Sequence, residues 1–272
     1  MTGTSDISLP PVFVINRPKD THRRQDMEER LGKVGIIPVF FPATDGYALD
    51  IDTLPDYDRE RRLRYFGKDL GHGEIGCLLS HRAIYQKMVD ENIDRAVILE
   101  DDVFLEDTFR QVLENIEQVG IEWDVIRFVG HGKVFDIGYR QLAPLGDTHW
   151  LTRVPTSPSG AYAYMLTRKA AKTFLHFMQK NWVPVDIVHS RAWETGLETL
   201  LVQPSPVTPD LVSPSTIGDT RFERPSAITG LTKIVHPFYR FWYKLSNGAG
   251  KRLLYTFTAS RDRKSSRQDT PH

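Results

Sequence analysis

Residues 97–102, with the sequence Val-Ile-Leu-Glu-Asp-Asp, join an apolar run to three consecutive acidic side chains. Such a run of β-forming residues predicts a buried strand, so the acids follow at the carboxyl end of that strand. Ligands bind at this end of the strands in open α/β sheets. Because clustered carboxylates repel one another, they favour a cation, and Mg²⁺ or Mn²⁺ binds carboxylates together with phosphate oxygens. The segment therefore predicts a diphosphate bridged by a metal ion.

The same acids have a second interpretation, in which they only precede a helix. Apolar side chains recur at helical spacing across residues 109–119, and acidic groups are favourable at the positive end of a helix dipole. The residues of this segment alone do not distinguish between the two interpretations.

The elements around the acidic segment alternate between strand and helix. Strands are predicted at residues 12–15, 36–41, 96–99, 123–129, 161–166 and 199–202. Helices are predicted at residues 21–33, 77–92 and 109–119, with a further helix capped by Thr167. We expect residues 50–69 to be a surface excursion, because they show no clear period, and the proline-containing residues 130–159 to be a loop. The opening strand-helix-strand unit implies parallel strands.

The composition excludes several classes of protein. The chain has 272 residues, enough for one large or two small domains, and 40% of them are hydrophobic. Lys plus Arg and Asp plus Glu both number 35, so no net charge attracts nucleic acid. The glycine-rich patterns of dinucleotide-binding proteins and of P-loop NTPases do not occur.

Several features favour a protein of the cytoplasm. Cys77 is the only cysteine, so it has no partner for an intrachain disulfide, and we interpret it as a small core residue. Residues 1–9 lack the basic start and the apolar centre of a signal peptide. No apolar stretch reaches the roughly 18 residues that a membrane-spanning helix needs.

The C-terminal region has a different character. Aromatic side chains crowd residues 237–245, and residues 251–272 carry an excess of four positive charges. Aromatic groups beside a basic tail suit the edge of an anionic membrane. The alternative is a packed aromatic helix followed by a disordered tail.

Separated segments of the chain, taken in order, carry a family resemblance. They are residues 12–16 (VFVIN), 43–46 (ATDG), 73–81 (GEIGCLLSH), 98–103 (ILEDDV), 160–164 (GAYAY) and 184–186 (PVD). This ordered set resembles glycosyltransferase family 25, the lipooligosaccharide biosynthesis group, between about residues 11 and 217. The resemblance implies a GT-A-like fold, an α/β protein with a Rossmann-type, mixed and mostly parallel sheet flanked by helices. Glu100 departs from a strict Asp-x-Asp pattern.

The same resemblance implies an enzyme that transfers a sugar with inversion. Its donor is a nucleotide sugar, usually UDP-galactose, and its acceptor is a lipooligosaccharide or another oligosaccharide or glycolipid. We expect the transfer reaction to take place in the cytoplasm, at the inner face of the membrane, and we expect no nucleic-acid partner. Mn²⁺ or Mg²⁺ would act as a Lewis acid by bridging the phosphates of the leaving group. The alternative is a non-catalytic protein that binds a nucleotide sugar or a glycan on the same fold.

The candidate donor-site residues lie in these segments. We assign Asp102 as the direct metal ligand, since it lies furthest beyond its strand. Glu100 shares its face, because strand side chains alternate, and binds the metal through water or holds the ribose. Asp101, a further donor-site candidate, points to the other side. The remaining candidates are Asn16, Arg17, Thr44, Asp45, Ser80 and His81.

These donor-site candidates also have ordinary structural alternatives. Arg17 is equally a surface arginine, and Asp45 is equally part of an Asp-Gly turn. His81 is equally a hydrogen-bonded core histidine.

Inverting transfer also needs a base that takes the proton of the acceptor hydroxyl. Asp186 is the first candidate because apolar residues flank it on both sides. A capping or turn role is the alternative for Asp186. Glu194 and Glu198 are the rival candidates, on a stretch expected to be helical after Ser190.

The chain is divided accordingly. Residues 1–10 are expected to be flexible, and residues 11–232 to form a GT-A-like catalytic domain. Residues 233–258 form the aromatic segment that suits a membrane surface, and residues 259–272 form a basic disordered tail.

Overall fold

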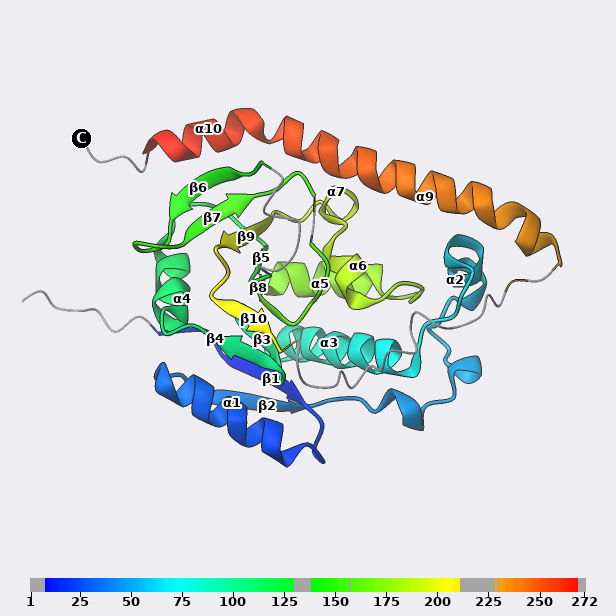
Figure 1. Cartoon of the computed structure of the whole chain (residues 1–272), viewed down its shortest axis with the longest axis horizontal. Helices are drawn as coiled ribbons and strands as arrows, with labels where there is room; N and C mark the ends of the chain where they lie inside the picture. The colour runs from blue at the N-terminus through cyan, green and yellow to red at the C-terminus, as the bar shows by residue number, and fades with distance from the viewer. Residues whose placement is uncertain (1–7, 130–137, 157, 211–227, 229, 269–272) are drawn as a thin grey trace, which may run out of the picture.

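The computed structural model describes residues 8–129, 138–156, 158–210, 228 and 230–268. Within these residues a mixed sheet forms the centre of the molecule, and helices flank it (Figure 1). The predicted α/β fold with a mixed sheet between helices is therefore confirmed. Residues 1–7 of the segment predicted to be flexible, residues 1–10, lie outside the described residues.

The large sheet joins strands from most of the described chain. Its order is β2 (Pro38–Pro42), β1 (Val12–Asn16), β3 (Arg95–Glu100), β8 (Ala163–Thr167), β5 (Val125–Arg127), β9 (Thr199–Gln203), β7 (Trp150–Arg153) and β6 (Arg140–Pro144). The pairs β2–β1, β1–β3 and β5–β9 are parallel, and the other neighbouring pairs are antiparallel. Within this sheet only β8 and β7 are reversed, so most strands still share one direction. A second sheet pairs β4 (Val103–Leu105) with β10 (Val207–Pro209).

Helices pack on each face of the large sheet. The α-helices are α1 (Thr21–Lys33), α2 (Arg59–Phe66), α3 (His72–Asp90), α4 (Phe109–Gln118), α5 (Arg168–Phe177), α6 (Val185–His189), α7 (Ala192–Thr195), α9 (Gly230–Phe257) and α10 (Ala259–Gln268), with 3₁₀ turns η1 (Gly46–Ala48) and η2 (Ile51–Thr53). Alternate strand residues point to opposite sides. Val12 and Val97 therefore meet α1 and α4 in one core, whereas Phe13 and Ile98 meet α3 and α5 in the other.

Helix α2 lies within residues 50–69, where the sequence predicted only a surface excursion, so that prediction was wrong. Asp58 caps its first turn through a side-chain hydrogen bond. Its apolar residues Tyr65 and Phe66 pack on the ring of Trp182, with ring centres 5.1 and 6.0 Å apart. The helix was missed because the partner that buries its aromatic residues lies far along the chain.

Three further segments differ from the prediction. The predicted loop at residues 130–159 contains β6 and β7, which pair as an antiparallel hairpin and extend the sheet beyond β9. The predicted disordered tail at residues 259–272 contains α10, and residues 269–272 lie outside the described part. Helix α3 begins at His72 rather than at about Cys77, because Gly71 N donates to the Glu74 carboxylate over 2.7 Å.

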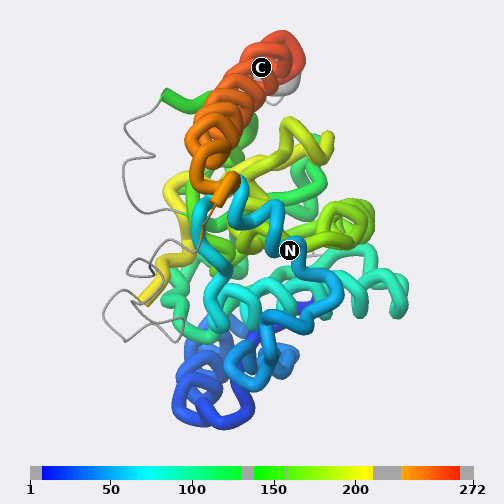
Figure 2. Tube along the Cα trace, turned by 90° about the vertical axis from the view of Figure 1, so that its right-hand side faces the viewer, coloured from blue at the N-terminus to red at the C-terminus, as the bar shows by residue number. Residues whose placement is uncertain are grey.

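Helices α9 and α10 form one long side of the molecule. In Figure 1 and in Figure 2 they lie along the edge opposite α1. The aromatic segment predicted at residues 233–258 falls almost entirely within α9. None of the helices in the described part of the chain combines the length and the apolar character that crossing a membrane requires.

Candidate functional site

The carboxyl ends of β1, β2 and β3 meet at one edge of the sheet because the three strands are parallel neighbours. Ile15 lies opposite Glu100 in the register, so the residues that follow β1 lie beside the acids that follow β3. The chain beyond β2 stays at this edge, where Ala43 N donates a hydrogen bond to Asn16 O over 2.9 Å. Three loops are thereby brought together.

A cleft opens at this edge, between the strand ends and the first turns of α3. The predicted residues that line it are Arg17, Thr44, Asp45, Ser80, His81, Glu100, Asp101 and Asp102. Its cavity volume is about 90 Å³, and its mouth is open to solvent. Two other predicted residues, Asn16 and Asp186, are not among the described residues that line it. The fold therefore gathers most of the predicted donor-site residues, and their roles remain predictions.

Asp101 is held at the floor of the cleft by two side chains. Its Oδ2 accepts a hydrogen bond from Asn16 Nδ2 over 2.7 Å, and its Oδ1 accepts one from Arg23 Nη1 over 3.0 Å. Asn16 does not line the cleft itself, but its hydrogen bond orients the Asp101 carboxylate that does. Arg23 was missed by the sequence analysis because it lies in α1 and reaches the acids only in three dimensions.

Asp102 is a partly buried carboxylate of the acidic turn. Burial, together with the charge of Glu100, raises the pKa of Asp102 to about 6. Arg23 acts in the opposite direction, since its Nη1 lies 3.4 Å from Asp102 Oδ2. Burial is the larger cause of the raised pKa, so the charged form of Asp102 is disfavoured unless a further cation stabilises it.

Glu100 faces two donors from α3 that could extend a metal site. Its Oε1 lies 3.8 Å from Cys77 Sγ and 3.5 Å from His81 Nε2. Cys77 and His81 are four residues apart on the helix and so share one face. One ligand atom from each residue lies within 4.8 Å of the others. The sequence analysis interpreted Cys77 as a core residue, because the glutamate that it faces comes from a different element.

A chain of buried side chains fixes the ring of His81. Its Nδ1 lies 2.6 Å from the hydroxyl of Tyr164, which lies 2.7 Å from the hydroxyl of Tyr85. The Tyr85 hydroxyl in turn lies 2.7 Å from His189 Nε2. Burial raises the pKa of both tyrosines and lowers that of His189, so these three groups remain uncharged. His81 therefore presents Nε2 to Glu100, and this buried nitrogen makes no hydrogen bond within the described residues.

Ser80 connects α3 to the loop that carries Thr44. Its hydroxyl accepts a hydrogen bond from Thr44 N over 2.8 Å and donates one to Gly76 O over 2.7 Å. At the same place the backbones of Gly46 and Gly76 touch. A Cβ built on Gly76 would lie 2.7 Å from Thr44 O and 2.8 Å from Gly46 N. Both glycines are therefore required for the close approach of this loop to the helix.

Gly76→Ala is expected to widen this contact. An added methyl group must push the Thr44 loop away from α3, which should cost about 1–3 kcal/mol of unfolding free energy. Chemical denaturation measures this cost. Gly32→Ala is the matched control, since it lies in helix α1 with nothing within 4 Å of the added Cβ. A Gly76 variant with unchanged stability would contradict the role of this contact.

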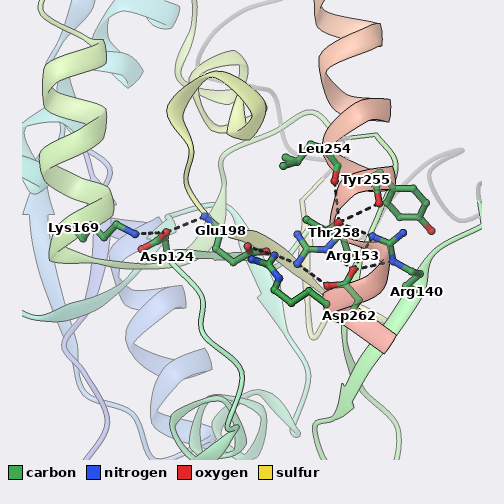
Figure 3. A network of polar contacts seen from close by, with 10 residues as sticks. Asp124, Arg140, Arg153, Lys169, Glu198, Leu254, Tyr255, Thr258 and Asp262 are labelled. Atoms are coloured by element: carbon green, nitrogen blue, oxygen red, sulfur yellow. Dashed lines mark hydrogen bonds and ion pairs between the residues drawn. The ribbon is translucent and has the colours of Figure 1, made fainter. Parts of the chain in front are cut away.

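Asp186 lies in α6, half-buried, and its Oδ1 accepts a hydrogen bond from Ile187 N over 2.8 Å. Its negative charge acts on the fully buried Arg127, whose pKa burial lowers to about 10. The two other candidates for the base already form ion pairs. Glu194 pairs with Arg191, and Glu198 pairs with Arg153 and Arg261 (Figure 3 shows Glu198 and Arg153). Asp186 remains the predicted base.

The fold and the site define an α/β protein with an acidic ligand cleft at the ends of parallel strands. The chain belongs to glycosyltransferase family 25 (LPS biosynthesis protein), whose pattern matches residues 9–189.

Curated relatives match the chain over parts of their length. A glycosyltransferase 25 family member of Aedes aegypti is 30% identical over 190 residues, which are 64% of this chain and 29% of that protein. Procollagen galactosyltransferase 2 of Homo sapiens is 30% identical over 135 residues, 45% of this chain and 21% of that protein. A Rattus norvegicus protein named probable inactive glycosyltransferase 25 family member 3 is 28% identical over 260 residues, 83% of this chain and 44% of that protein. The chain spans less than half the length of these relatives.

Proposed function

We propose that the chain is an inverting, metal-dependent glycosyltransferase. It moves galactose from UDP-galactose to a sugar of a lipooligosaccharide or another surface glycan, in the cytoplasm. Family membership and the name of the human galactosyltransferase relative support this proposal. The observation that carries it is the cluster of Glu100, Asp101 and Asp102 in the cleft at the ends of the parallel strands.

The residues of the cleft fit a divalent cation. His81 Nε2 is buried, makes no hydrogen bond within the described residues and lies 3.5 Å from Glu100 Oε1 in the acidic turn. Asp102 and Glu100 would hold Mn²⁺ or Mg²⁺, with His81 Nε2 as a further donor beside Glu100. When bound, the ion would supply Lewis-acid stabilisation of the leaving diphosphate.

The chain's own residues at the cleft suit a nucleoside diphosphate. Arg17 is anchored through Asp20, 2.6 Å from its Nε, and its guanidinium provides further donors for a phosphate. Thr44 and Asp45 carry short polar groups for ribose or uracil. Tyr47 also lines the cleft and stacks on His72, with ring centres 5.3 Å apart. An aromatic ring at the cleft can stack on the base, a role that the sequence analysis missed.

The proposal is tested with the purified chain, Mn²⁺ and a panel of UDP-sugars. We expect slow hydrolysis of UDP-galactose that stops when the metal is chelated, and faster release of UDP when a sugar acceptor is added. The absence of both turnover and UDP-sugar binding would reject the proposal. Binding without turnover would instead support the non-catalytic alternative, which the relatives named inactive make a specific possibility.

Asp186→Asn is expected to lower transfer to an acceptor by about 10²–10⁴-fold, the range for loss of a general base. The amide keeps the shape of the side chain but cannot take the proton of the acceptor hydroxyl. Initial rates with acceptor present measure the effect, and UDP binding should stay unchanged. Glu194→Gln is the matched control, since Glu194 pairs with Arg191. Near-normal transfer by the Asp186 variant would place the base elsewhere.

A further inference from the structure

Helix α9 has one face that is fixed against the rest of the molecule. Tyr243 packs edge-on against Phe66, with ring centres 5.0 Å apart, and against Trp182 at 6.0 Å. His236 Nδ1 lies 2.9 Å from Arg64 O, and Asn247 accepts a hydrogen bond from a tryptophan of α7. These contacts, spread along the helix, determine which side of α9 faces outward.

The outward face of α9 is strongly apolar. Its exposed large hydrophobic side chains are Leu231, Ile234, Phe238, Phe241, Trp242, Leu245, Leu253 and Phe257, each between 50 and 76% exposed. Apart from the adjacent Phe241 and Trp242 and the gap at residues 246–252, they recur at intervals of three or four residues, so they follow one stripe of the helix. Among the described residues, eight of the thirteen exposed large hydrophobic side chains lie on this one helix. A concentration of this kind marks an interaction surface.

The charges of α9 indicate the kind of surface that it meets. The helix carries Lys233, Arg240, Lys244, Lys251 and Arg252, and its sequence contains neither Asp nor Glu. Lys233, Lys244 and Arg252 are exposed beside the apolar stripe. A partner must therefore offer apolar and negatively charged groups together along a helix of 28 residues, which is about 42 Å long. The surface of an anionic bilayer offers both over any length.

We infer that α9 lies in the plane of an anionic lipid bilayer. Its apolar stripe inserts between the acyl chains, and its lysines and arginines contact the lipid phosphates. The helix lies along the edge of the molecule opposite α1, so docking leaves α1 on the side away from the lipid (Figures 1 and 2). This inference goes beyond the proposed transfer reaction and does not depend on it.

Flotation of the full chain with lipid vesicles tests the inference. We expect binding to vesicles of phosphatidylcholine with phosphatidylglycerol, at least tenfold weaker binding to phosphatidylcholine alone, and weaker binding as salt rises. Trp242 emission should shift to the blue when the anionic vesicles are added. Failure to float with anionic vesicles would overturn the inference.

Two double variants distinguish insertion of α9 into the bilayer from nonspecific hydrophobic binding to vesicles. Phe238→Ser/Phe241→Ser should weaken vesicle binding by more than tenfold without unfolding the chain, because both side chains are exposed. Ile37→Ser/Tyr139→Ser, at exposed hydrophobic residues outside α9, is the matched control and should bind like the parent. Equal binding by both pairs would overturn the inference. A dimer in light scattering that the α9 pair abolishes, without vesicle binding, would assign this face to a second copy and also overturn it.

Discussion

Asp102→Asn is expected to remove metal-dependent turnover of UDP-galactose, by at least about 10²-fold, while the chain stays folded. Asp102 lies two residues beyond β3, in the cleft where we propose that a divalent cation binds. The amide keeps the size of the side chain but lowers the affinity for a hard divalent ion, and stabilisation of the leaving diphosphate is lost with it. Release of UDP measures turnover, and electron paramagnetic resonance of Mn²⁺ measures the metal.

Stability should move in the opposite direction to activity in this variant. The raised pKa of Asp102 means that its charged form is less favourable in the folded chain than in the unfolded chain. At neutral pH the asparagine removes that charge, so the melting temperature should stay equal or rise by a few degrees. Asp107→Asn is the matched control, an exposed aspartate two residues beyond β4 that should alter neither property. Full turnover by the Asp102 variant would reject the assignment of this residue.

The parts of the fold that the sequence predicted are those with a local pattern. Helix α1 was predicted because its apolar residues recur at helical spacing, and strand β3 because its apolar residues form one uninterrupted run. The grouping of residues 16–17 with the acids after β3 followed from parallel strands, whose carboxyl ends share an edge. The pattern of hydrophobic residues was therefore enough to predict the strands whose ends form the cleft.

The parts that were missed depend on distant partners. Tyr65 of α2 packs against the core through residues far along the chain such as Trp182, and Arg23 of α1 reaches the acidic turn through Asp101. Glu100 faces Cys77 only because β3 passes beside α3. The spacing of residues within one element cannot predict these contacts, because each contact joins two elements that are far apart in the sequence.

Helix α10 is the clearest example, because ion pairs with distant residues make the charged tail part of the folded structure. Asp262 is only 4% exposed. Its Oδ2 accepts hydrogen bonds from Arg153 Nε over 2.8 Å and from Arg140 Nε over 2.9 Å (Figure 3). Arg140 also donates to Thr258 Oγ1 over 2.7 Å, and Arg153 pairs with Glu198. The negative charge of Asp262 therefore joins α10 to the hairpin of β6 and β7.

Asp262→Asn is expected to destabilise this junction by about 3–5 kcal/mol, the range for removing one partner of a buried ion pair. The variant leaves two arginines near an uncharged amide, and Arg153 is itself only 5% exposed. Hydrogen exchange should rise across residues 259–268 and in β6, and the denaturation midpoint should fall.

The control is Asp147→Asn, an exposed aspartate in the turn between β6 and β7, which should leave both measurements unchanged. Coupling distinguishes an ion pair from a simple packing contact. If Asp262 acts through its charge on Arg140, then Arg140→Met should cost much less in the Asp262 variant than in the parent chain. Equal costs in the two backgrounds, or unchanged exchange in α10, would mean that packing rather than this charge holds the helix on the sheet.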